Sequence, residues 1–262
     1  MSEQLYARLK GQGPTAIVLL HGFGGHHGEW IDIQPELARD ALVIAYDLPG
    51  HGRSMDSPGA GAAGVAARAI LADLAQRGHQ RVHVAGFSMG GAIATLMAMR
   101  APDRIASLTL LAPGGYGPEI SETLLRRFAD ATDADALRRS MDEMSAPGFR
   151  TPTRNVAGLA AVRFVPGQRA RMLEIVAAIA KDGKQGEIPP DALAALRMPV
   201  SVMWGTADPV LPFAQSAGLP AHFALEVIDG AGHMLPVEAL KGVTVLIRRT
   251  VRQAEAALSA KL

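Results

Sequence analysis

The chain has 262 residues, of which 48% are hydrophobic and 19% are charged, which is the composition of a folded globular protein and not of a disordered or fibrous one. The 26 lysines and arginines nearly balance the 25 aspartates and glutamates, so there is no basic excess for gripping a phosphate backbone, and nucleic acid is excluded as an expected partner. The absence of cysteine excludes disulfides, thiolate metal sites and a cysteine nucleophile.

The apolar runs of the chain are short. The first, residues 16–20, is too short for the core of a signal peptide, and no other run approaches the roughly 20 apolar residues that a membrane span needs. We therefore expect no membrane partner and a cytoplasmic location. The length favours one α/β domain with a large core, whereas the oligomeric state cannot be predicted from these features.

Short runs of apolar and β-branched residues alternate with longer helical patterns, which is typical of a parallel sheet wrapped by helices. The runs lack polar alternation, as expected of strands buried on both faces. The predicted buried strands are residues 16–20, 42–46, 82–85, 107–111, 200–204 and 225–228. Residues 5–10 are expected to add an antiparallel edge strand. The helices predicted between the strands are residues 31–39, 65–77, 90–100 and 237–258.

No strand-like run occurs between residues 114 and 197, where amphipathic segments follow one another. The helices predicted there are residues 121–131, 134–145, 154–164, 168–181 and 190–196. Helices inserted between two strands of an open α/β sheet usually lie over the carboxyl ends of the strands, where ligands bind. We therefore expect a helical cap at residues 114–197 on a core formed by residues 1–113 and 198–262.

The strongest local signal is Gly-Phe-Ser-Met-Gly-Gly at residues 86–91, which follows one predicted strand and opens a predicted helix. In this context Gly-x-Ser-x-Gly predicts a sharp, strained turn that exposes the serine hydroxyl, with glycines where side chains would collide with neighbouring elements. The N-terminus of the helix adds free N–H groups for a developing negative charge. A serine in a glycine-rich turn can be a simple helix cap, but this context favours Ser88 as a nucleophile.

An oxyanion hole needs a second N–H group from a loop beside the nucleophile. Residues 21–25, His-Gly-Phe-Gly-Gly, directly follow the first predicted buried strand and fit this position. The predicted donors are the backbone N–H groups of Phe23 and Met89. The Phe23 side chain is then free to line the pocket, whereas His21 is expected to be a packing residue.

A serine nucleophile also needs a histidine base. Of the eight histidines, His233 follows a predicted strand at the same edge of the sheet as the nucleophile, and it is the predicted base. His26 and His27 follow the oxyanion loop and are expected at the pocket entrance. His51 lies in a turn and is expected to be structural.

The base in turn needs an orienting carboxylate. Asp208 gives the chain order Ser88, Asp208, His233, which is the order of this triad on this kind of fold. Asp229 is an alternative, but it would have to fold back on its own loop to reach His233. Asp47 is a second alternative, and it follows a strand on the far side of the nucleophile. Order and context favour Asp208.

Five motifs of the chain occur in the order found in the α/β-hydrolase superfamily, and the resemblance covers nearly the whole length. They are residues 21–25, residues 47–54 (Asp-Leu-Pro-Gly-His-Gly-Arg-Ser), residues 86–91, residues 205–209 (Gly-Thr-Ala-Asp-Pro) and residues 232–233 (Gly-His). Within the superfamily, residues 102–105 and 110–120 are similar to the hydrolase-like domain of the acetoin dehydrogenase acyltransferase subunit. That subunit carries a lipoyl domain, for which no segment here has the length or position, so acyl transfer to lipoamide is not implied.

The resemblance implies the α/β-hydrolase fold with a cap inserted between two strands, and it implies cleavage through an acyl-enzyme. Haloalkane dehalogenases and epoxide hydrolases have an aspartate in place of Ser88, and epoxide hydrolases also rely on a pair of cap tyrosines, where this chain has Tyr116 alone. Carbon–carbon bond hydrolases usually have a tryptophan in place of Met234. The turn at residues 86–91 also resembles that of cofactor-free haloperoxidases, which are perhydrolases with the same triad.

The predicted function is therefore hydrolysis of a small carboxylic ester or a related acyl compound. A perhydrolase, a carbon–carbon bond hydrolase and a low-turnover ligand receptor on the same fold remain alternatives. The expected pocket residues are Phe23, His26, Tyr116 and Met234, and the expected partner is a small-molecule substrate. We predict no metal and no organic cofactor, because the chain has no cysteine, no His-Glu-x-x-His pattern and no dinucleotide-binding fingerprint.

Between residues 145 and 173 of the predicted cap there are five arginines and no acidic residue. They are Arg150, Arg154, Arg163, Arg169 and Arg171. One interpretation is a solvated helix face whose acidic partners lie elsewhere on the cap. The other is that one guanidinium points into the cleft and pairs with an anionic group of the substrate.

Overall fold

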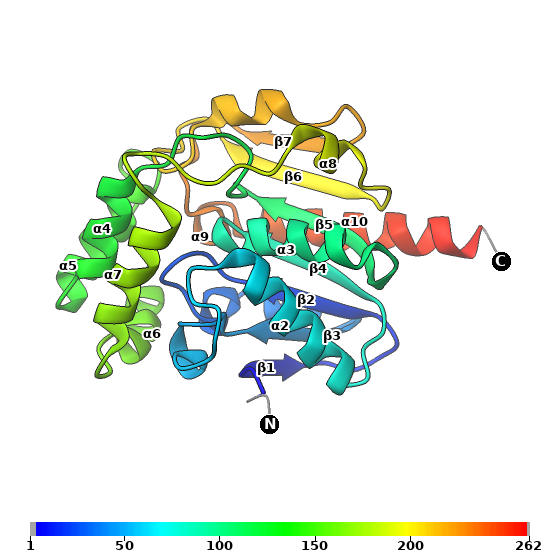
Figure 1. Cartoon of the computed structure of the whole chain (residues 1–262), viewed down its shortest axis with the longest axis horizontal. Coiled ribbons are helices and arrows are strands. Elements are labelled where there is room, and N and C mark those ends of the chain that lie inside the picture. Colours follow the sequence, from blue (N-terminus) through cyan, green and yellow to red (C-terminus); the bar gives the residue numbers. More distant parts are fainter. Residues whose placement is uncertain (1–3, 261–262) are drawn as a thin grey trace.

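The computed structural model describes residues 4–260. The ends of the predicted α/β core region, residues 1–3 and 261–262, lie outside the described residues. The strands are β1 (Ala7–Lys10), β2 (Ala16–Leu20), β3 (Leu42–Tyr46), β4 (Val82–Phe87), β5 (Ile105–Leu111), β6 (Val200–Gly205) and β7 (Ala224–Ile228). They form one sheet in the order β1-β3-β2-β4-β5-β6-β7 (Figure 1). All neighbours pair in parallel except β1, which runs antiparallel to β3 as predicted.

The strands form because their sequences are apolar runs that can be covered on both faces. Every residue of β2, β4, β5 and β6 is buried, which confirms the predicted continuous burial. β7 differs, because it is the last strand of the sheet and pairs with β6 alone among the described residues. Its Leu225 and Val227 side chains are 41% and 46% exposed, so the prediction that residues 225–228 are buried on both faces is wrong.

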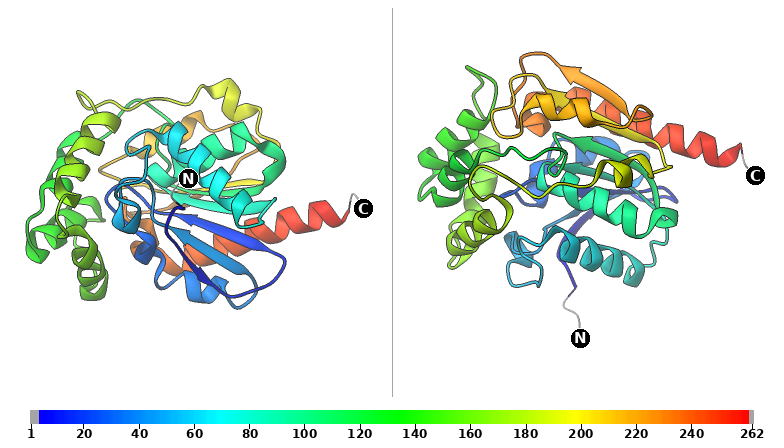
Figure 2. Two further views of the ribbon diagram at one scale, coloured as in Figure 1. Left: turned by 60° about the horizontal axis from the view of Figure 1, so that its bottom comes forward. Right: turned by 45° about the horizontal axis from the view of Figure 1, so that its top comes forward.

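Helices cover both faces of the sheet. The helices are α1 (Gln34–Leu37), α2 (Ala63–Gln76), α3 (Met89–Arg100), α4 (Glu122–Asp130), α5 (Ala134–Met144), α6 (Thr153–Arg163), α7 (Gln168–Ile179), α8 (Pro190–Ala194), α9 (Leu235–Glu238) and α10 (Leu240–Ser259). α2 and α3 pack side by side on one face, and α1 and α10 lie on the other (Figures 1 and 2). No helix among residues 4–260 combines the length and apolar character needed to span a membrane.

Two predicted helices are interrupted in the structure. The helix expected at residues 31–39 is reduced to α1, because Pro35 has no N–H group and lies in the first turn. The helix expected at residues 237–258 is divided at Ala239, which leaves the helical conformation with φ −122° and ψ 33° and closes the last turn of α9.

α4, α5, α6 and α7 form a separate group at one end of the sheet (Figure 1). Each of these helices buries an apolar face; the buried residues of α4 and α5 include Leu125, Phe128, Leu137 and Met141. α8 does not join this group and lies apart from it (Figures 1 and 2). The cap boundaries at residues 114 and 197 remain a prediction.

Candidate active site

Ser88 occupies a strained turn between β4 and α3. Its backbone has φ 51° and ψ −115°, a conformation that is costly for a residue with a side chain. A Cβ atom at Gly86 would lie 2.4 Å from the Gly90 carbonyl oxygen, and one at Gly90 would lie 2.4 Å from the Leu20 carbonyl oxygen. The turn therefore requires both glycines of the Gly-x-Ser-x-Gly pattern, and it holds the Ser88 hydroxyl at the carboxyl edge of the sheet.

Three side chains from distant parts of the sequence meet at this edge. The Ser88 Oγ lies 3.0 Å from His233 Nε2, and His233 Nδ1 lies 2.8 Å from Asp208 Oδ2. All three residues are at most 8% exposed. The ring of Phe87 lies beside the imidazole, with the two centroids 4.9 Å apart. Histidine is thus in position to accept a proton from the hydroxyl, and the carboxylate is in position to orient the imidazole.

Asp208 is held by its own loop. Its Oδ1 atom accepts hydrogen bonds of 2.8 Å from the N–H groups of Val210 and Leu211, which leaves Oδ2 for His233. Asp229 is exposed and accepts a hydrogen bond from Thr206 Oγ1. The structure therefore brings Asp208, and not Asp229, to the histidine.

The other alternative carboxylate, Asp47, organises a neighbouring loop. It accepts hydrogen bonds from the backbone and ring nitrogens of His27 and from the backbone N–H of Arg53. Burial opposes its charge, but these hydrogen bonds outweigh burial and lower the pKa of Asp47 to about 2. Asp47 does not contact His233 and has a structural role here.

The loop at residues 21–25 lies beside Ser88, as predicted. The N–H of Gly22 points at Glu29 Oε1, that of Gly24 donates to His51 Nε2, and that of Gly25 donates to the Gly22 carbonyl. The intervening N–H of Phe23 has no acceptor among the described residues. The N–H of Met89, at the first position of α3, likewise has none among residues 4–260.

Two buried histidines tie this loop to the turn at residues 47–52. His21 bonds the Gly22 carbonyl through Nδ1 and accepts the Leu48 N–H through Nε2. His51 bonds the Pro49 carbonyl through Nδ1 and accepts the Gly24 N–H through Nε2. Each ring therefore needs one protonated and one free nitrogen. Burial lowers the pKa of His21 to about 4 and that of His51 well below its usual range, so both are neutral.

The loop that carries His233 is anchored to the helices above it. The His233 N–H donates to the Met144 carbonyl at the end of α5. The Glu238 carboxylate accepts hydrogen bonds from the N–H groups of Gly232, Met234 and Ala146, at 2.8 to 2.9 Å. One carboxylate therefore connects both sides of the histidine to the α5–α6 connection. No sequence pattern marks Glu238 as part of the site, since only the fold brings it near Ala146.

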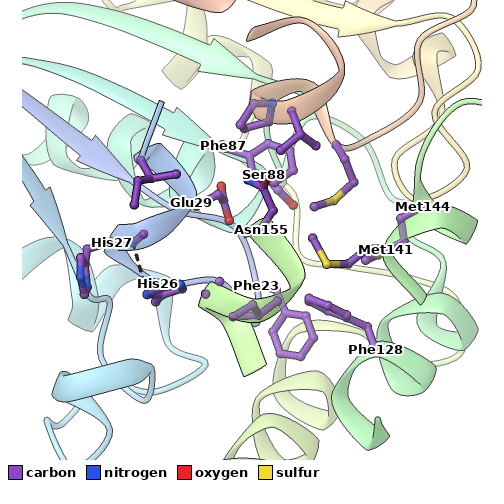
Figure 3. Close-up of a pocket in the computed structure, with 18 of the residues that line it drawn as sticks. Phe23, His26, His27, Glu29, Phe87, Ser88, Phe128, Met141, Met144 and Asn155 are labelled. Carbon is purple, nitrogen blue, oxygen red and sulfur yellow. Dashed lines mark hydrogen bonds between the residues drawn. The ribbon is translucent and has the colours of Figure 1, made fainter. Parts of the chain in front are cut away.

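A cavity of about 240 Å³ opens beside Ser88 and His233 (Figure 3). Its apolar lining includes Phe23, Phe87, Leu125, Phe128, Met141, Met144, Leu159 and Met234. Its polar lining comprises Arg8, His26, His27, Glu29, Arg154 and Asn155, besides Ser88 and His233. A second cavity, of about 300 Å³, lies on the α3 side and shares Phe23, Ser88 and Leu125 with the first. Ser88 thus lies between two cavities.

Three of the four predicted pocket residues, Phe23, His26 and Met234, line the first cavity. Tyr116 does not line either cavity, so its placement in the pocket is a correction. Its side chain is buried below the site, where its hydroxyl lies 3.0 Å from the Thr95 hydroxyl on α3. A buried phenol needs such a partner, and this contact turns Tyr116 toward the core.

The five arginines between residues 145 and 173 have different partners. Arg150, Arg169 and Arg171 pair with Asp142, Asp130 and Glu174, which supports the solvated-face interpretation for these three. Arg154 lines the first cavity, but its guanidinium pairs with Asp32 at 2.8 Å.

Arg163 points inward and is 1% exposed. It donates to the carbonyl oxygens of Phe128 and Gly24, at 2.6 and 2.7 Å, and its guanidinium carbon lies 4.6 Å from the centroid of the Phe128 ring. Burial lowers the pKa of Arg163 to about 10, so it remains charged at neutral pH. Its guanidinium therefore joins α4 and α6 to the loop at residues 21–25. Arg163 is one of the five arginines considered above for an anionic group of the substrate, whereas its partners in the structure are backbone carbonyls.

Among the described residues, one group of side chains has the spacing to hold a metal ion. The potential ligand atoms of His26, His27 and Asp47 lie within 4.8 Å of one another. Two of these residues are already joined, because His27 Nδ1 lies 2.8 Å from the Asp47 carboxylate. The hydrogen bonds of Asp47 account for this arrangement, and the absence of a metal requirement remains a prediction.

Comparisons with known proteins agree with this architecture. A family model described as alpha/beta hydrolase fold matches residues 15–240. The chain is 34% identical over 236 residues to the dihydrolipoyllysine-residue acetyltransferase component of the acetoin cleaving system of Pseudomonas putida, an alignment that covers 90% of this chain and 63% of that protein. The corresponding component of Cupriavidus necator is 28% identical over 244 residues, covering 93% and 65%. The chain thus spans less than two thirds of the length of these relatives.

Among solved structures, the 2-hydroxy-6-oxo-6-phenylhexa-2,4-dienoate hydrolase of Rhodococcus sp. strain RHA1 matches with a TM-score of 0.77 and 26% sequence identity, over 94% of both chains. The match to the family model, which extends over most of the chain, defines the class: the chain belongs to the α/β-hydrolase fold family. The predicted fold class and the predicted similarity to the acyltransferase component are both confirmed.

Proposed function

We propose that the chain is a serine hydrolase that cleaves a small carboxylic ester or a related acyl compound. The observation that carries the proposal is the hydrogen-bonded series Ser88, His233, Asp208 beside the N–H groups of Phe23 and Met89, which have no acceptor among the described residues. Such a series activates a serine, and such a pair of donors stabilises an oxyanion.

In the proposed reaction, His233 takes the proton of the Ser88 hydroxyl while the Ser88 Oγ atom attacks the carbonyl carbon of the ester. The carbonyl oxygen becomes an oxyanion and accepts hydrogen bonds from the Phe23 and Met89 N–H groups. His233 then gives the proton to the leaving alcohol, and the acyl-enzyme forms. Water attacks this intermediate with the same help from His233, which releases the acid and restores the Ser88 hydroxyl. Asp208 holds the imidazole in the required tautomer throughout.

The two cavities suggest how the substrate lies. The leaving oxygen must face His233, because the histidine donates its proton to that oxygen. The first cavity, which His233 lines, is therefore proposed to take the alcohol part, and the second cavity, which Met89 and α3 line, is proposed to take the acyl part. The small volumes of both cavities favour small esters. We also propose that the protein is cytoplasmic and that the reaction needs no cofactor.

Carbon–carbon bond hydrolysis is the second candidate, favoured by the 26% identity to the Rhodococcus hydrolase. A nitrophenyl ester series and a vinylogous diketone substrate, assayed side by side, separate the two reactions. Turnover of the diketone with none of the esters would exclude the proposed esterase.

Labelling by a fluorophosphonate probe tests the proposed nucleophile independently of the substrate. We expect covalent modification at Ser88 and no labelling of the Ser88→Ala variant. Tight binding of ligands without labelling or turnover would favour a receptor and contradict the proposal.

A further inference from the structure

The first cavity contains two polar side chains that the proposed reaction does not use. Glu29 belongs to the short 3₁₀ helix His27–Trp30, and Asn155 belongs to the first turn of α6. Both line the cavity together with Ser88, and Figure 3 shows the Glu29 carboxyl directed into it. The two residues come from opposite sides, one from the core and the other from the helices above it.

Asn155 has an unsatisfied acceptor. Its Oδ1 atom is buried and has no hydrogen-bond partner among residues 4–260. On α6, Asn155 shares its face with Gly158 and Leu159, which also line the cavity, so helical periodicity directs all three residues to the same space. A buried polar atom without a partner is costly, and here it faces a cavity that a ligand can fill.

Glu29 is held beside the oxyanion loop. Its Oε1 atom lies 3.4 Å from the Gly22 nitrogen, and its Oε2 atom lies where a Cβ of Gly25 would be, within 2.4 Å. Gly25 therefore leaves the space that this carboxyl occupies. Burial raises the pKa of Glu29 to about 8, and the Gly22 N–H only partly offsets this effect. At neutral pH the group is mainly a carboxylic acid, with one O–H to donate and oxygens to accept.

We propose that Glu29 and Asn155 form a subsite for a neutral hydroxyl group on the alcohol part of the substrate. A hydroxyl matches the pair because it donates one hydrogen bond and accepts others. The remaining lining is apolar, which suits the carbon chain that would carry the hydroxyl. The preferred substrates would then be monoesters of diols or polyols, an assignment that rests on the proposed esterase function.

The charges around the cavity argue against an ionic ligand group. A cation would meet the guanidinium groups of Arg8 and Arg154, which line the same cavity. Arg8 is already bonded to Gln34 and to the His27 carbonyl, and Arg154 is paired with Asp32, so neither is free to clamp an anion. An anion would also meet the Asn155 Oδ1 atom, an acceptor without a partner among the described residues that repels negative charge. A neutral hydroxyl avoids both conflicts.

The test compares hexanoate esters that differ only in the alcohol: n-butanol, the butanediols and aminobutanol. We expect the wild-type protein to hydrolyse the best butanediol monoester with a kcat/KM about tenfold higher than the butyl ester, as expected for one well-made hydrogen bond in a dry site. The aminobutyl ester should be no better than the butyl ester. A preference for the aminobutyl ester would overturn the assignment of a neutral group.

Substitutions at the two residues test the subsite itself through the ratio of the two kcat/KM values. Glu29→Leu and Asn155→Leu should each bring the diol-to-butyl ratio close to one. Glu29→Gln should keep most of the preference, since an amide resembles the neutral acid in shape and hydrogen bonding. Met141→Leu, which alters the lining without altering its polar groups, serves as the matched control and should keep the ratio.

The outcomes separate the subsite from the esterase proposal. Equal kcat/KM values for the butyl and butanediol esters, or a ratio that Glu29→Leu leaves unchanged, would overturn the subsite while the esterase stands. Hydrolysis of none of the esters by the wild-type protein would contradict the proposed function and the subsite with it. Thermal unfolding checks that each variant is folded, and the Glu29→Gln and Glu29→Leu pair decides the result if Asn155→Leu is not.

Discussion

The core loops and the helices α4–α7 line the same cavity, but they are held in place by different interactions. The loops are fixed by buried hydrogen bonds to single backbone groups, as His21, His51 and Asp47 show. The helices are held by apolar packing of residues such as Leu137 and by ion pairs on their exposed faces. Buried hydrogen bonds have strict geometry, whereas packed apolar faces tolerate substitution at similar volume. Changes that break the buried hydrogen bonds of the loops should therefore affect the rate, and changes in the apolar lining that the helices supply should affect the choice of substrate.

The largest expected effect is the loss of ester turnover when Ser88 or His233 is replaced. Ser88→Ala and His233→Ala should each lower ester turnover on the order of 10⁵-fold, because the members of a triad act as a unit. The fold should be retained, since alanine adds no bulk at either position. Rates with a nitrophenyl ester and thermal unfolding measure the two effects. Substantial esterase activity in Ser88→Ala would disprove the proposed mechanism.

Replacing Asp208, the carboxylate proposed to orient His233, should have the next largest effect on turnover. Asp208→Asn should lower kcat by roughly 10³- to 10⁴-fold, because the imidazole loses its orienting acceptor and the imidazolium its counter-charge. Asp229→Asn serves as the matched control on an exposed residue, and it should have little effect. A greater loss of kcat in Asp229→Asn or in Asp47→Asn would show that chain order assigned the wrong carboxylate.

How far the sequence predicts the site follows the same division. The strands β2 and β3 have the predicted bounds, and the motifs around Ser88 and the oxyanion loop locate the backbone geometry, because local sequence determines both. The partners that fix these loops were not predictable. Glu238 bonds Ala146, 92 positions away, and Arg163 bonds Gly24, 139 positions away. Neither pair has a local pattern, since each contact exists only once the helices have packed on the core.

The buried histidines predict a loss of stability in acid. A buried histidine with a lowered pKa contributes its full stability above about pH 6.5, the pKa that it has in the unfolded chain. Below that pH the unfolded chain takes up a proton and the folded protein does not, so the free energy of unfolding falls until the pH reaches the folded pKa. For His21, with a folded pKa of about 4, the loss between pH 7 and pH 5 is about 2 kcal/mol. Urea unfolding at the two pH values measures this loss.

His21→Asn removes the titrating group and is the control for this measurement. The variant should be less stable at pH 7, because the Leu48 N–H loses its acceptor geometry. Its unfolding free energy should nevertheless fall by about 2 kcal/mol less than that of the wild type between pH 7 and pH 5. An equal fall in both proteins would show that His21 does not carry the effect.

Arg163 connects the two regions, so its substitution measures how strongly they are coupled. Arg163→Met should leave the buried carbonyls of Gly24 and Phe128 without donors, at a cost of about 1–3 kcal/mol in stability. Because Gly24 follows Phe23 in the oxyanion loop, kcat should fall roughly tenfold or more, with a smaller change in KM. A change in KM alone would indicate that Arg163 acts on substrate binding and not on the loop.

The smallest effect is expected on the exposed side of the α5–α6 connection. The Arg150 side chain is 81% exposed, so water screens its ion pair with Asp142, and such pairs contribute little. Asp142 keeps a second bond, from the Thr151 N–H, that does not depend on the arginine. Arg150→Ala should therefore change the unfolding free energy by less than about 0.5 kcal/mol, and it should leave the kcat/KM values for anionic and neutral esters in the same ratio. The matched comparison is Arg154→Ala, because Arg154 lines the first cavity. If either variant removed a preference for anionic esters that the wild type shows at low salt, a cap arginine would act on the substrate after all, and the solvated-face interpretation would be wrong for that residue.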